Sequence, residues 1–170
     1  PLPREEPVRA RPQVAMICGT ENAPEKRWPV SHWRALVEQL LAAVPEVEIV
    51  FFGTPADRVI TDQVADGFPS GAIQNLAGKT DLAAFCDGLK QCNVVVCNDT
   101  GGMHLANMLG TPVAVVFGPT NPVRTGPIFD APTHILQPEG CPVAGGMPID
   151  GVSAERVFAA VLPHVEGAQS

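Results

Sequence analysis

The sequence predicts an α/β fold: a doubly wound, mainly parallel six-stranded Rossmann-like sheet with helices on both faces. Short, near-continuous apolar runs alternate with amphipathic stretches from residue 13 onward, and strands that are apolar throughout are typical of parallel sheets covered on both faces. Right-handed crossovers then favour the strand order 3-2-1-4-5-6. In that order strands one and four are neighbours, and a ligand is expected beyond their carboxyl ends.

Each element has its own signal. Apolar, β-branched runs predict strands at Val14–Cys18, Val47–Phe52, Ile73–Leu76, Asn93–Cys97, Pro112–Phe117 and His134–Leu136. Apolar residues at helical spacing predict helices from an N-cap at Ser31 to a stop at Pro45, over Asp57–Ala65, from about Asp81 to Gln91, over Met103–Leu109, and after an N-cap at Ser153. Residues 138–151 are rich in Gly and Pro and predict an irregular loop.

Composition limits the class of protein. The 170 residues are 45% hydrophobic and 17% charged, which indicates one globular domain. The net charge of −7 argues against nucleic acid as a partner. No apolar stretch approaches the ~20 residues that cross a bilayer, and no signal peptide is recognisable. The five cysteines form no C-x-x-C pair, so we expect reduced thiols in a cytoplasmic protein: Cys18, Cys86, Cys92, Cys97 and Cys141.

The first twelve residues differ from the rest, because four of them are proline. Such composition is typical of a linker. We therefore expect a linker over 1–12, a folded domain over 13–170, and a chain that is a piece of a longer protein.

The stretch 93–104 is the most informative. An apolar strand pattern ends at Asn98-Asp99-Thr100-Gly101-Gly102, and a helical pattern follows at once. The two glycines let backbone approach a ligand, and the unpaired N–H groups of a helix start suit a phosphate or pyrophosphate. The alternative is an ordinary strand-to-helix turn with Thr100 as N-cap and Asp99 facing the helix dipole. The turn alone leaves both open.

The loop after the first strand, Gly19 to Pro29, is long for such a connection, where roughly 2–6 residues are usual. Lys26 and Arg27 would bring positive charge to the pyrophosphate position, with Lys26 the favoured residue, and Thr20 would bring a hydroxyl. Solvated cations are the alternative. For Trp28 we expect a packing role that anchors the loop.

Other candidates follow the remaining strands. His104 lies one helical turn beyond Thr100 and could donate to a phosphate oxygen, or be structural. Asp57 stands where dinucleotide folds place a ribose-binding acid. Lys79, in Gly78-Lys79-Thr80-Asp81, belongs to the same sheet edge or to a plain capped helix start. Asp99 and His104 lack a third ligand, which argues against a metal site. The G-x-G-x-x-G and P-loop motifs are missing.

Several ordered motifs together resemble one family. They are Lys26-Arg27-Trp28-Pro29 followed by Trp33, Asn75 to Thr80, Asn98 to Ala106, Leu109 to Pro112, and Phe117 to Pro122. From Val14 to the last helix the chain resembles the ADP-heptose:lipopolysaccharide heptosyltransferases. The late loop, Cys141 to Met147, looks shortened beside that family.

The resemblance implies a fold and a function. It implies the C-terminal, donor-binding half of an inverting GT-B glycosyltransferase, which binds ADP-heptose for transfer to the lipopolysaccharide inner core without a metal cofactor. Donor contacts would come from Thr20, Lys26, Asp57, Lys79, Asp99, Thr100, Gly101, Gly102 and His104. The catalytic base is expected on an N-terminal domain, so this chain alone would be inactive. The implied location is cytoplasmic, or peripheral at the inner membrane for the full-length protein.

Two other functions stay open on the sequence. The same crevice would serve the donor-binding domain of another GT-B transferase or a nucleotide-sugar epimerase, with a different nucleotide. A nucleotide-binding module without catalysis, or a purely structural domain, belongs to another class.

Overall fold

A computed structural model describes residues 11–21 and 23–166. Its sheet has six strands in the order β3-β2-β1-β4-β5-β6, and every neighbouring pair is parallel. The predicted strand order is therefore confirmed. The strands are β1 (Gln13–Ile17), β2 (Glu48–Phe52), β3 (Ile73–Asn75), β4 (Val94–Asn98), β5 (Val113–Val116) and β6 (Thr133–Leu136).

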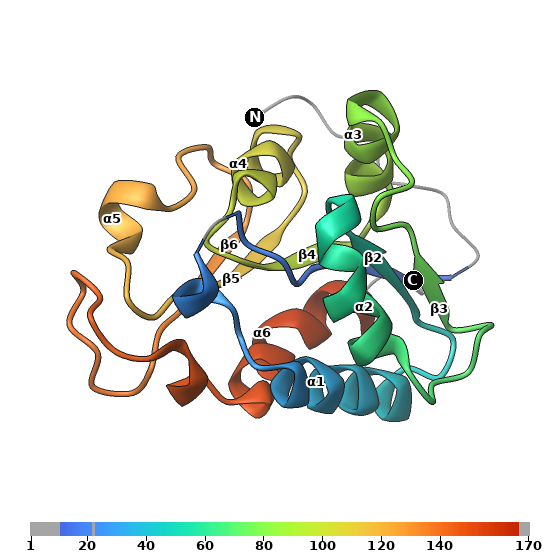
Figure 1. Cartoon of the computed structure of the whole chain (residues 1–170), viewed down its shortest axis with the longest axis horizontal. Helices are drawn as coiled ribbons and strands as arrows, with labels where there is room; N and C mark the ends of the chain where they lie inside the picture. The colour runs from blue at the N-terminus through green and yellow to red at the C-terminus, as the bar shows by residue number, and fades with distance from the viewer. Residues whose placement is uncertain (1–10, 22, 167–170) are drawn as a thin grey trace.

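Helices cover both faces of the sheet (Figure 1). One face packs against α1 (Val30–Ala43), α2 (Arg58–Ala65) and α6 (Ala154–Glu166). The other face packs against α3 (Leu82–Gln91) and α4 (Gly101–Met108). The apolar strand residues alternate between these two cores, which explains why the strand patterns are continuous rather than alternating. Within the described ranges, no helix is long and apolar enough to cross a membrane.

The register brings the strand ends together. Ile17, at the end of β1, pairs with Phe52 of β2 on one side and with Cys97 of β4 on the other. The chain therefore leaves β1, β2 and β4 at nearly the same level of the sheet. In Figure 1 the sheet runs from β3 on the right to β5 and β6 on the left, and α5 lies at the far left.

Two details of the helices differ from the predictions. The helix α1 begins at Val30, so Ser31 is not its N-cap; Pro29 precedes it with φ −57°, a value preset by the proline ring. The helix α4 begins at Gly101, directly after Thr100, and includes the predicted stretch from Met103 to Met108. A short helix, α5 (Pro122–Thr125), was not predicted; the Asn121 side chain accepts from the Val123 N–H at 2.9 Å and caps it.

The loops contain three short 3₁₀ turns. These are η1 (Pro24–Lys26) after β1, η2 (Pro55–Asp57) after β2, and η3 (Ile149–Gly151) before α6. The last lies in the predicted irregular loop 138–151. Ser153 precedes α6 as predicted, and its hydroxyl accepts from the Arg156 N–H at 3.4 Å.

Of the predicted linker 1–12, residues 1–10 lie outside the described part of the chain. The Pro12 carbonyl accepts from the Glu48 N–H at 2.9 Å. The Arg11 side chain donates to the carbonyls of Glu46 at 2.9 Å and Gly71 at 3.1 Å. These two residues are therefore held against the β2 side of the sheet.

Candidate functional site

A cleft of 740 Å³ opens at the carboxyl edge, where the strand order reverses. Its walls come from five segments: the β1 loop, η2, the loop after β3, and the starts of α3 and α4. The polar and glycine residues among its lining are Gly19, Thr20, Glu21, Arg27, Gly53, Thr54, Asp57, Gly78, Thr80, Asp81, Thr100, Gly101 and Gly102. The crevice predicted at strands one and four is thus present as a cavity.

The start of α4 forms one wall. Thr100 occupies the N-cap position with an extended backbone, φ −148° and ψ 161°, but its side chain makes no capping hydrogen bond. A Cβ built on Gly101 would meet nothing within 4 Å. The helix start is therefore uncovered on the side of the cleft, and its N–H groups can meet a bound anion.

Lys26 and Asp99 bind each other instead of lining the cleft. Lys26 Nζ lies 3.1 Å from Asp99 Oδ2, and the Thr125 hydroxyl donates to the same oxygen at 3.1 Å. The Asp99 side chain is 7% exposed, whereas that of Lys26 is 25% exposed. This pair joins the β1 loop to the end of β4 and to α5, and much of the Lys26 charge is compensated within the protein.

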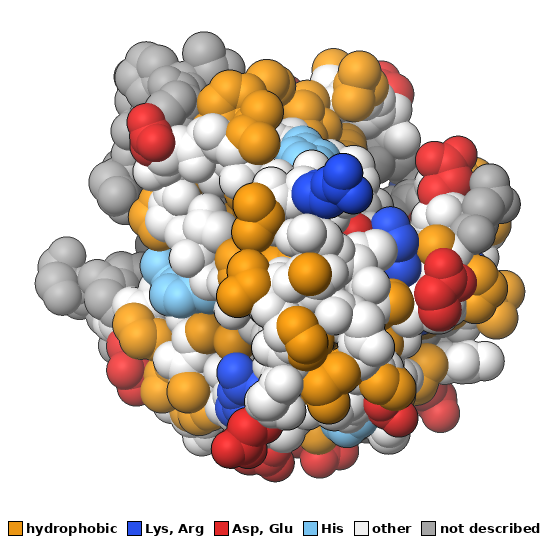
Figure 2. Space-filling view, turned by 90° about the vertical axis from the view of Figure 1, so that its left-hand side faces the viewer, with side chains coloured by type: hydrophobic (Ala, Val, Ile, Leu, Met, Phe, Trp, Pro, Cys, Tyr) orange, Lys and Arg blue, Asp and Glu red, His pale blue; other side chains and the backbone are white. Residues whose placement is uncertain are grey.

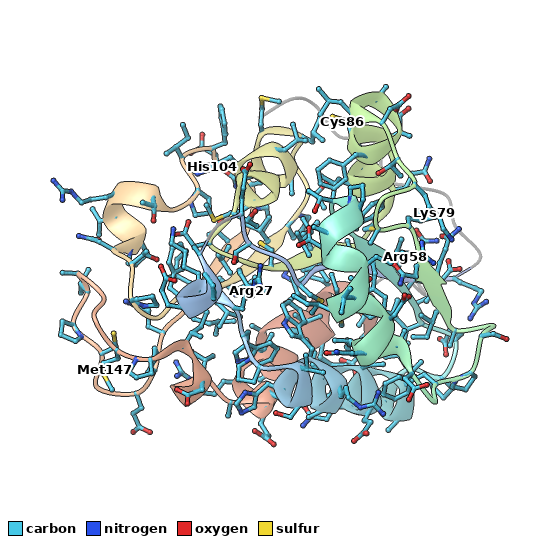
Figure 3. The ribbon with its side chains drawn as sticks, viewed as in Figure 1. Arg27, Arg58, Lys79, Cys86, His104 and Met147 are labelled. Carbon is cyan, nitrogen blue, oxygen red and sulfur yellow. The ribbon has the colours of Figure 1, made fainter. Side chains whose placement is uncertain are left out.

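Arg27 supplies the positive charge of the cleft wall. Its Nη2 donates to the Thr20 carbonyl at 3.3 Å, and its Nε is buried without a hydrogen-bond partner. Thr20 is 5% exposed, and its hydroxyl donates to the Ala23 carbonyl at 2.6 Å, which folds the loop back on itself. Arg27 lies near the centre of the view in Figure 3. The Lys26-Arg27 pair was the signal in the sequence, and the prediction favoured Lys26, whereas the structure places Arg27 in the lining.

Asp57 closes the opposite wall. Its Oδ2 accepts from the backbone N–H and from the hydroxyl of Thr54, both at 2.8 Å. A Cβ on Gly19 would lie only 2.0 Å from Asp57 Oδ1, and one on Gly53 would lie 2.9 Å from Asp57 Cβ. The two glycines therefore allow the carboxylate to sit against the ends of β1 and β2, where it lines the cleft.

Two further predicted residues do not line the cleft. Lys79 is exposed in the loop after β3, next to Gly78, whose φ of +71° is open to glycine without strain. His104 is partly exposed on α4. In the view of Figure 3, Lys79 and Arg58 lie to one side of Arg27, and His104 lies above it. The structure thus brings Thr20, Asp57, Thr100, Gly101 and Gly102 together and leaves Lys26, Lys79, Asp99 and His104 outside the lining.

Trp28 and Asn98 connect the loop after β1 to the end of β4, next to the cleft. Trp28 is 1% exposed, its ring donates to the Val152 carbonyl at 2.7 Å, and its packing role is confirmed. The fully buried Asn98 side chain accepts from the Trp28 N–H at 3.1 Å and donates to the Cys18 carbonyl at 2.9 Å. From the sequence, Asn98 was expected only as part of the turn, because a buried amide gives no periodic signal.

Two buried thiols lie beneath the cleft. Burial raises the pKa of Cys18 and of Cys97, and the nearby carboxylates of Asp57 and Asp99, respectively, raise them further. Both groups therefore stay protonated and unreactive in the folded protein.

We expect iodoacetamide at pH 8 to modify the partly exposed Cys86 and Cys141 of the native protein but not Cys18 or Cys97. Peptide mass spectrometry after a timed reaction measures the modified fraction at each position. The control is the same reaction in denaturant, where all five cysteines should react. Equal labelling of Cys97 and Cys141 in the native protein would contradict the buried position of Cys97.

The arrangement has the chemistry of an anion site. An uncovered helix start, a guanidinium and a carboxylate line the same cleft, as a diphosphate attached to a ribose would require. Among residues 11–21 and 23–166, no group of three or more His, Cys, Asp or Glu side chains is placed to hold a metal ion.

Known proteins share both sequence and fold with this chain. Residues 3–144 match the family described as glycosyltransferase family 9 (heptosyltransferase). Lipooligosaccharide heptosyltransferase 2 of Haemophilus influenzae is 35% identical over 133 residues, which are 76% of this chain and 38% of that protein. This chain therefore spans well under half of that relative.

Solved structures agree on the fold. The structure of E. coli ADP-heptose lps heptosyltransferase II is 24% identical, with a TM-score of 0.82 over 94% of this chain and 48% of that one. E. coli heptosyltransferase WaaC with ADP gives a TM-score of 0.77 at 24% identity, over 93% of this chain and 46% of that one. Since the family match spans most of the chain, this protein belongs to glycosyltransferase family 9, the heptosyltransferases.

Proposed function

We propose that this chain is the C-terminal, donor-binding domain of an inverting enzyme that transfers heptose from ADP-heptose to the lipopolysaccharide inner core. The observation that carries the proposal is the cleft at the reversal of the strand order, where the α4 start, Arg27 and Asp57 converge. The WaaC structure, solved with ADP, has the same fold and supports ADP as the nucleotide.

The cleft suggests a role for each of its residues. The backbone N–H groups at Gly101 and Gly102 and the Thr100 hydroxyl receive the diphosphate, and Arg27 neutralises its charge. The Asp57 carboxylate accepts a hydrogen bond from the ribose. The Thr20 oxygen meets a phosphate or the sugar.

The predicted residues outside the cleft lining have indirect or peripheral roles in this proposal. Lys26 and Asp99 act mainly as a pair, at 3.1 Å, that fixes the β1 loop beside the α4 start. His104 and Lys79 reach only parts of the donor that extend beyond the cleft, with Lys79 on the adenine side.

The chemistry divides between two halves of the enzyme. Transfer leaves negative charge on the departing diphosphate, and the α4 start and Arg27 stabilise it as it develops. The general base that takes the acceptor proton belongs to the N-terminal half, which this chain does not include. We therefore expect the chain to bind ADP without transferring heptose, at a cytoplasmic site that reaches the inner membrane only through the full-length protein.

Calorimetric titration with ADP, UDP and GDP tests the proposal. We expect selective binding of ADP, and a loss of affinity of about tenfold or more in Arg27→Gln, because a charge-assisted hydrogen bond contributes roughly 1.5–3 kcal/mol. Lys26→Ala should also weaken binding, since it leaves Asp99 uncompensated near the diphosphate.

Lys90→Gln is the control, since it removes the same unit of charge from the exposed end of α3. Its affinity for ADP should equal that of the unchanged protein. Preference for UDP or GDP would indicate the domain of a different glycosyltransferase or of an epimerase. No binding of any nucleotide would refute the donor-binding role.

A further inference from the structure

A second hollow, of 500 Å³, adjoins the cleft on the other side of Arg27. One wall is formed by η1 and its neighbours, with Pro24, Glu25 and Pro29. The other is formed by residues 146–150 of the irregular loop 138–151, which is called the late loop from here on. Arg27 lines both cavities. In Figure 3, Met147 lies on the opposite side of Arg27 from Arg58 and Lys79. The proposed donor site does not use this space.

The late loop that forms the second wall is held in place. The Gly146 N–H donates to the Gly118 carbonyl at 3.0 Å, which ties the loop to the end of β5. A Cβ on Gly118 would lie 2.6 Å from the backbone of Ile149, so the two segments pack too closely for any side chain at position 118. Ile149 is 5% exposed and belongs to the main core. The hollow is therefore preformed on packed elements.

The lining of the hollow combines two kinds of group. Glu25 and Asp150 are exposed carboxylates, which accept hydrogen bonds, and the guanidinium of Arg27, which also lines the hollow, carries hydrogen-bond donors. Met147, Pro24 and Pro29 provide apolar surface between them. A sugar ring fits both the polar and the apolar side chains of this lining. Its hydroxyl groups can form hydrogen bonds with the polar side chains, and the C–H groups on its faces can pack against the apolar ones. Two carboxylates disfavour a second phosphate.

We propose that this hollow binds a sugar ring of the acceptor oligosaccharide. The proposal rests on the donor-binding function proposed above, because Arg27 then separates the donor diphosphate from the acceptor sugar.

The position of the hollow agrees with an acceptor that arrives from outside. Figure 2 shows the left-hand side of the molecule in Figure 1, the side on which α5 lies. Hydrophobic side chains are spread over this face among separate basic and acidic ones. Met147 of the hollow lies toward this side in Figure 3, away from Arg58 and Lys79.

Titration with water-soluble deacylated lipopolysaccharide, followed by NMR in saturating ADP, tests the proposal. We expect saturable shifts of the Met147 methyl signal and of the 146–150 amides, with the buried methyls of Met16 and Met103 as internal references. Asp150→Asn should raise the dissociation constant for the oligosaccharide at least fivefold and leave ADP affinity unchanged, because a charged acceptor is lost. Asp87→Asn, an exposed carboxylate on α3, is the matched control and should change neither.

Any other outcome contradicts the proposal that the hollow binds the acceptor. ADP binding without oligosaccharide shifts at 146–150 refutes this inference alone, whereas absence of ADP binding refutes the donor function. Shifts of Met147 with an ADP-sugar but not with the oligosaccharide would assign the hollow to the donor sugar. Equal affinities of Asp150→Asn and the unchanged protein would place the oligosaccharide elsewhere.

Discussion

Asn98→Ala is expected to lower the free energy of unfolding by about 2–4 kcal/mol, because two buried backbone groups lose their partners and each such loss costs roughly 1–3 kcal/mol. These groups are the Trp28 N–H, at 3.1 Å from Asn98 Oδ1, and the Cys18 carbonyl, at 2.9 Å from Nδ2. Water cannot replace the amide, since Asn98 is fully buried. The β1 loop also loses its tie to β4, so affinity for ADP should fall with stability.

Denaturant unfolding followed by tryptophan fluorescence measures the change, because Trp28 lies in the affected contact. The control is Asn121→Ala, which removes a side chain that caps the surface helix α5 and should cost only about 1 kcal/mol. Asn98→Asp adds a second test, since it keeps an acceptor for Trp28 but loses the donor to Cys18. Equal stability of Asn98→Ala and Asn121→Ala would show that the clamp does not hold the loop.

Gly101→Ala should leave folding intact and reduce ADP affinity tenfold or more. A Cβ at Gly101 meets no protein atom within 4 Å, so the added methyl group projects into open space at the start of α4. Alanine is also at least as favourable as glycine in a helix. A diphosphate on the α4 start would have to occupy part of the same space, and a methyl group keeps it from the N–H groups.

Two other glycines make this test specific. Gly71→Ala is the matched control, because a Cβ there also meets nothing within 4 Å and the position does not line the cleft. Gly102→Ala should instead lower stability by about 1 kcal/mol, since its Cβ would lie 2.6 Å from Ile17 Cδ1 and force that side chain to move. Thermal unfolding and ADP calorimetry on all three variants separate the effects. Unchanged ADP affinity in Gly101→Ala would place the diphosphate away from α4.

The sequence contains most of the fold because the signals for it are local. Continuous apolar runs at β1, β2, β4 and β5 indicated a parallel sheet, and the handedness of the crossovers gave the strand order. The start of α1 was predicted wrongly: Pro29 rather than Ser31 precedes the helix. The difference arises because backbone geometry at a turn, rather than side-chain periodicity, decides where a helix begins.

The sequence predicted where the candidate site lies, but not all of the residues that line it. The strand order predicted that the loops after β1 and β4 lie side by side, and the glycine pair 101–102 indicated an anion site. The prediction favoured Lys26 over Arg27 as the cation that faces the cleft, but the lining contains Arg27, because two adjacent cations give no signal for their directions. The 3₁₀ turn η1 turns Lys26 toward Asp99, at 3.1 Å, and leaves Arg27 in the wall.

By itself, the sequence of this protein determined the class of fold, the strand order, the edge at which a ligand would bind and the family resemblance, because all of these depend on the types and spacing of residues along the chain. Only the tertiary structure decided which of the two cations lines the cleft, how Asn98 joins the end of β4 to the loop around Trp28, 70 residues earlier, and that a second hollow lies beyond Arg27. Those features depend on side-chain contacts between distant segments, and such contacts exist only once the sheet has brought the strand ends together.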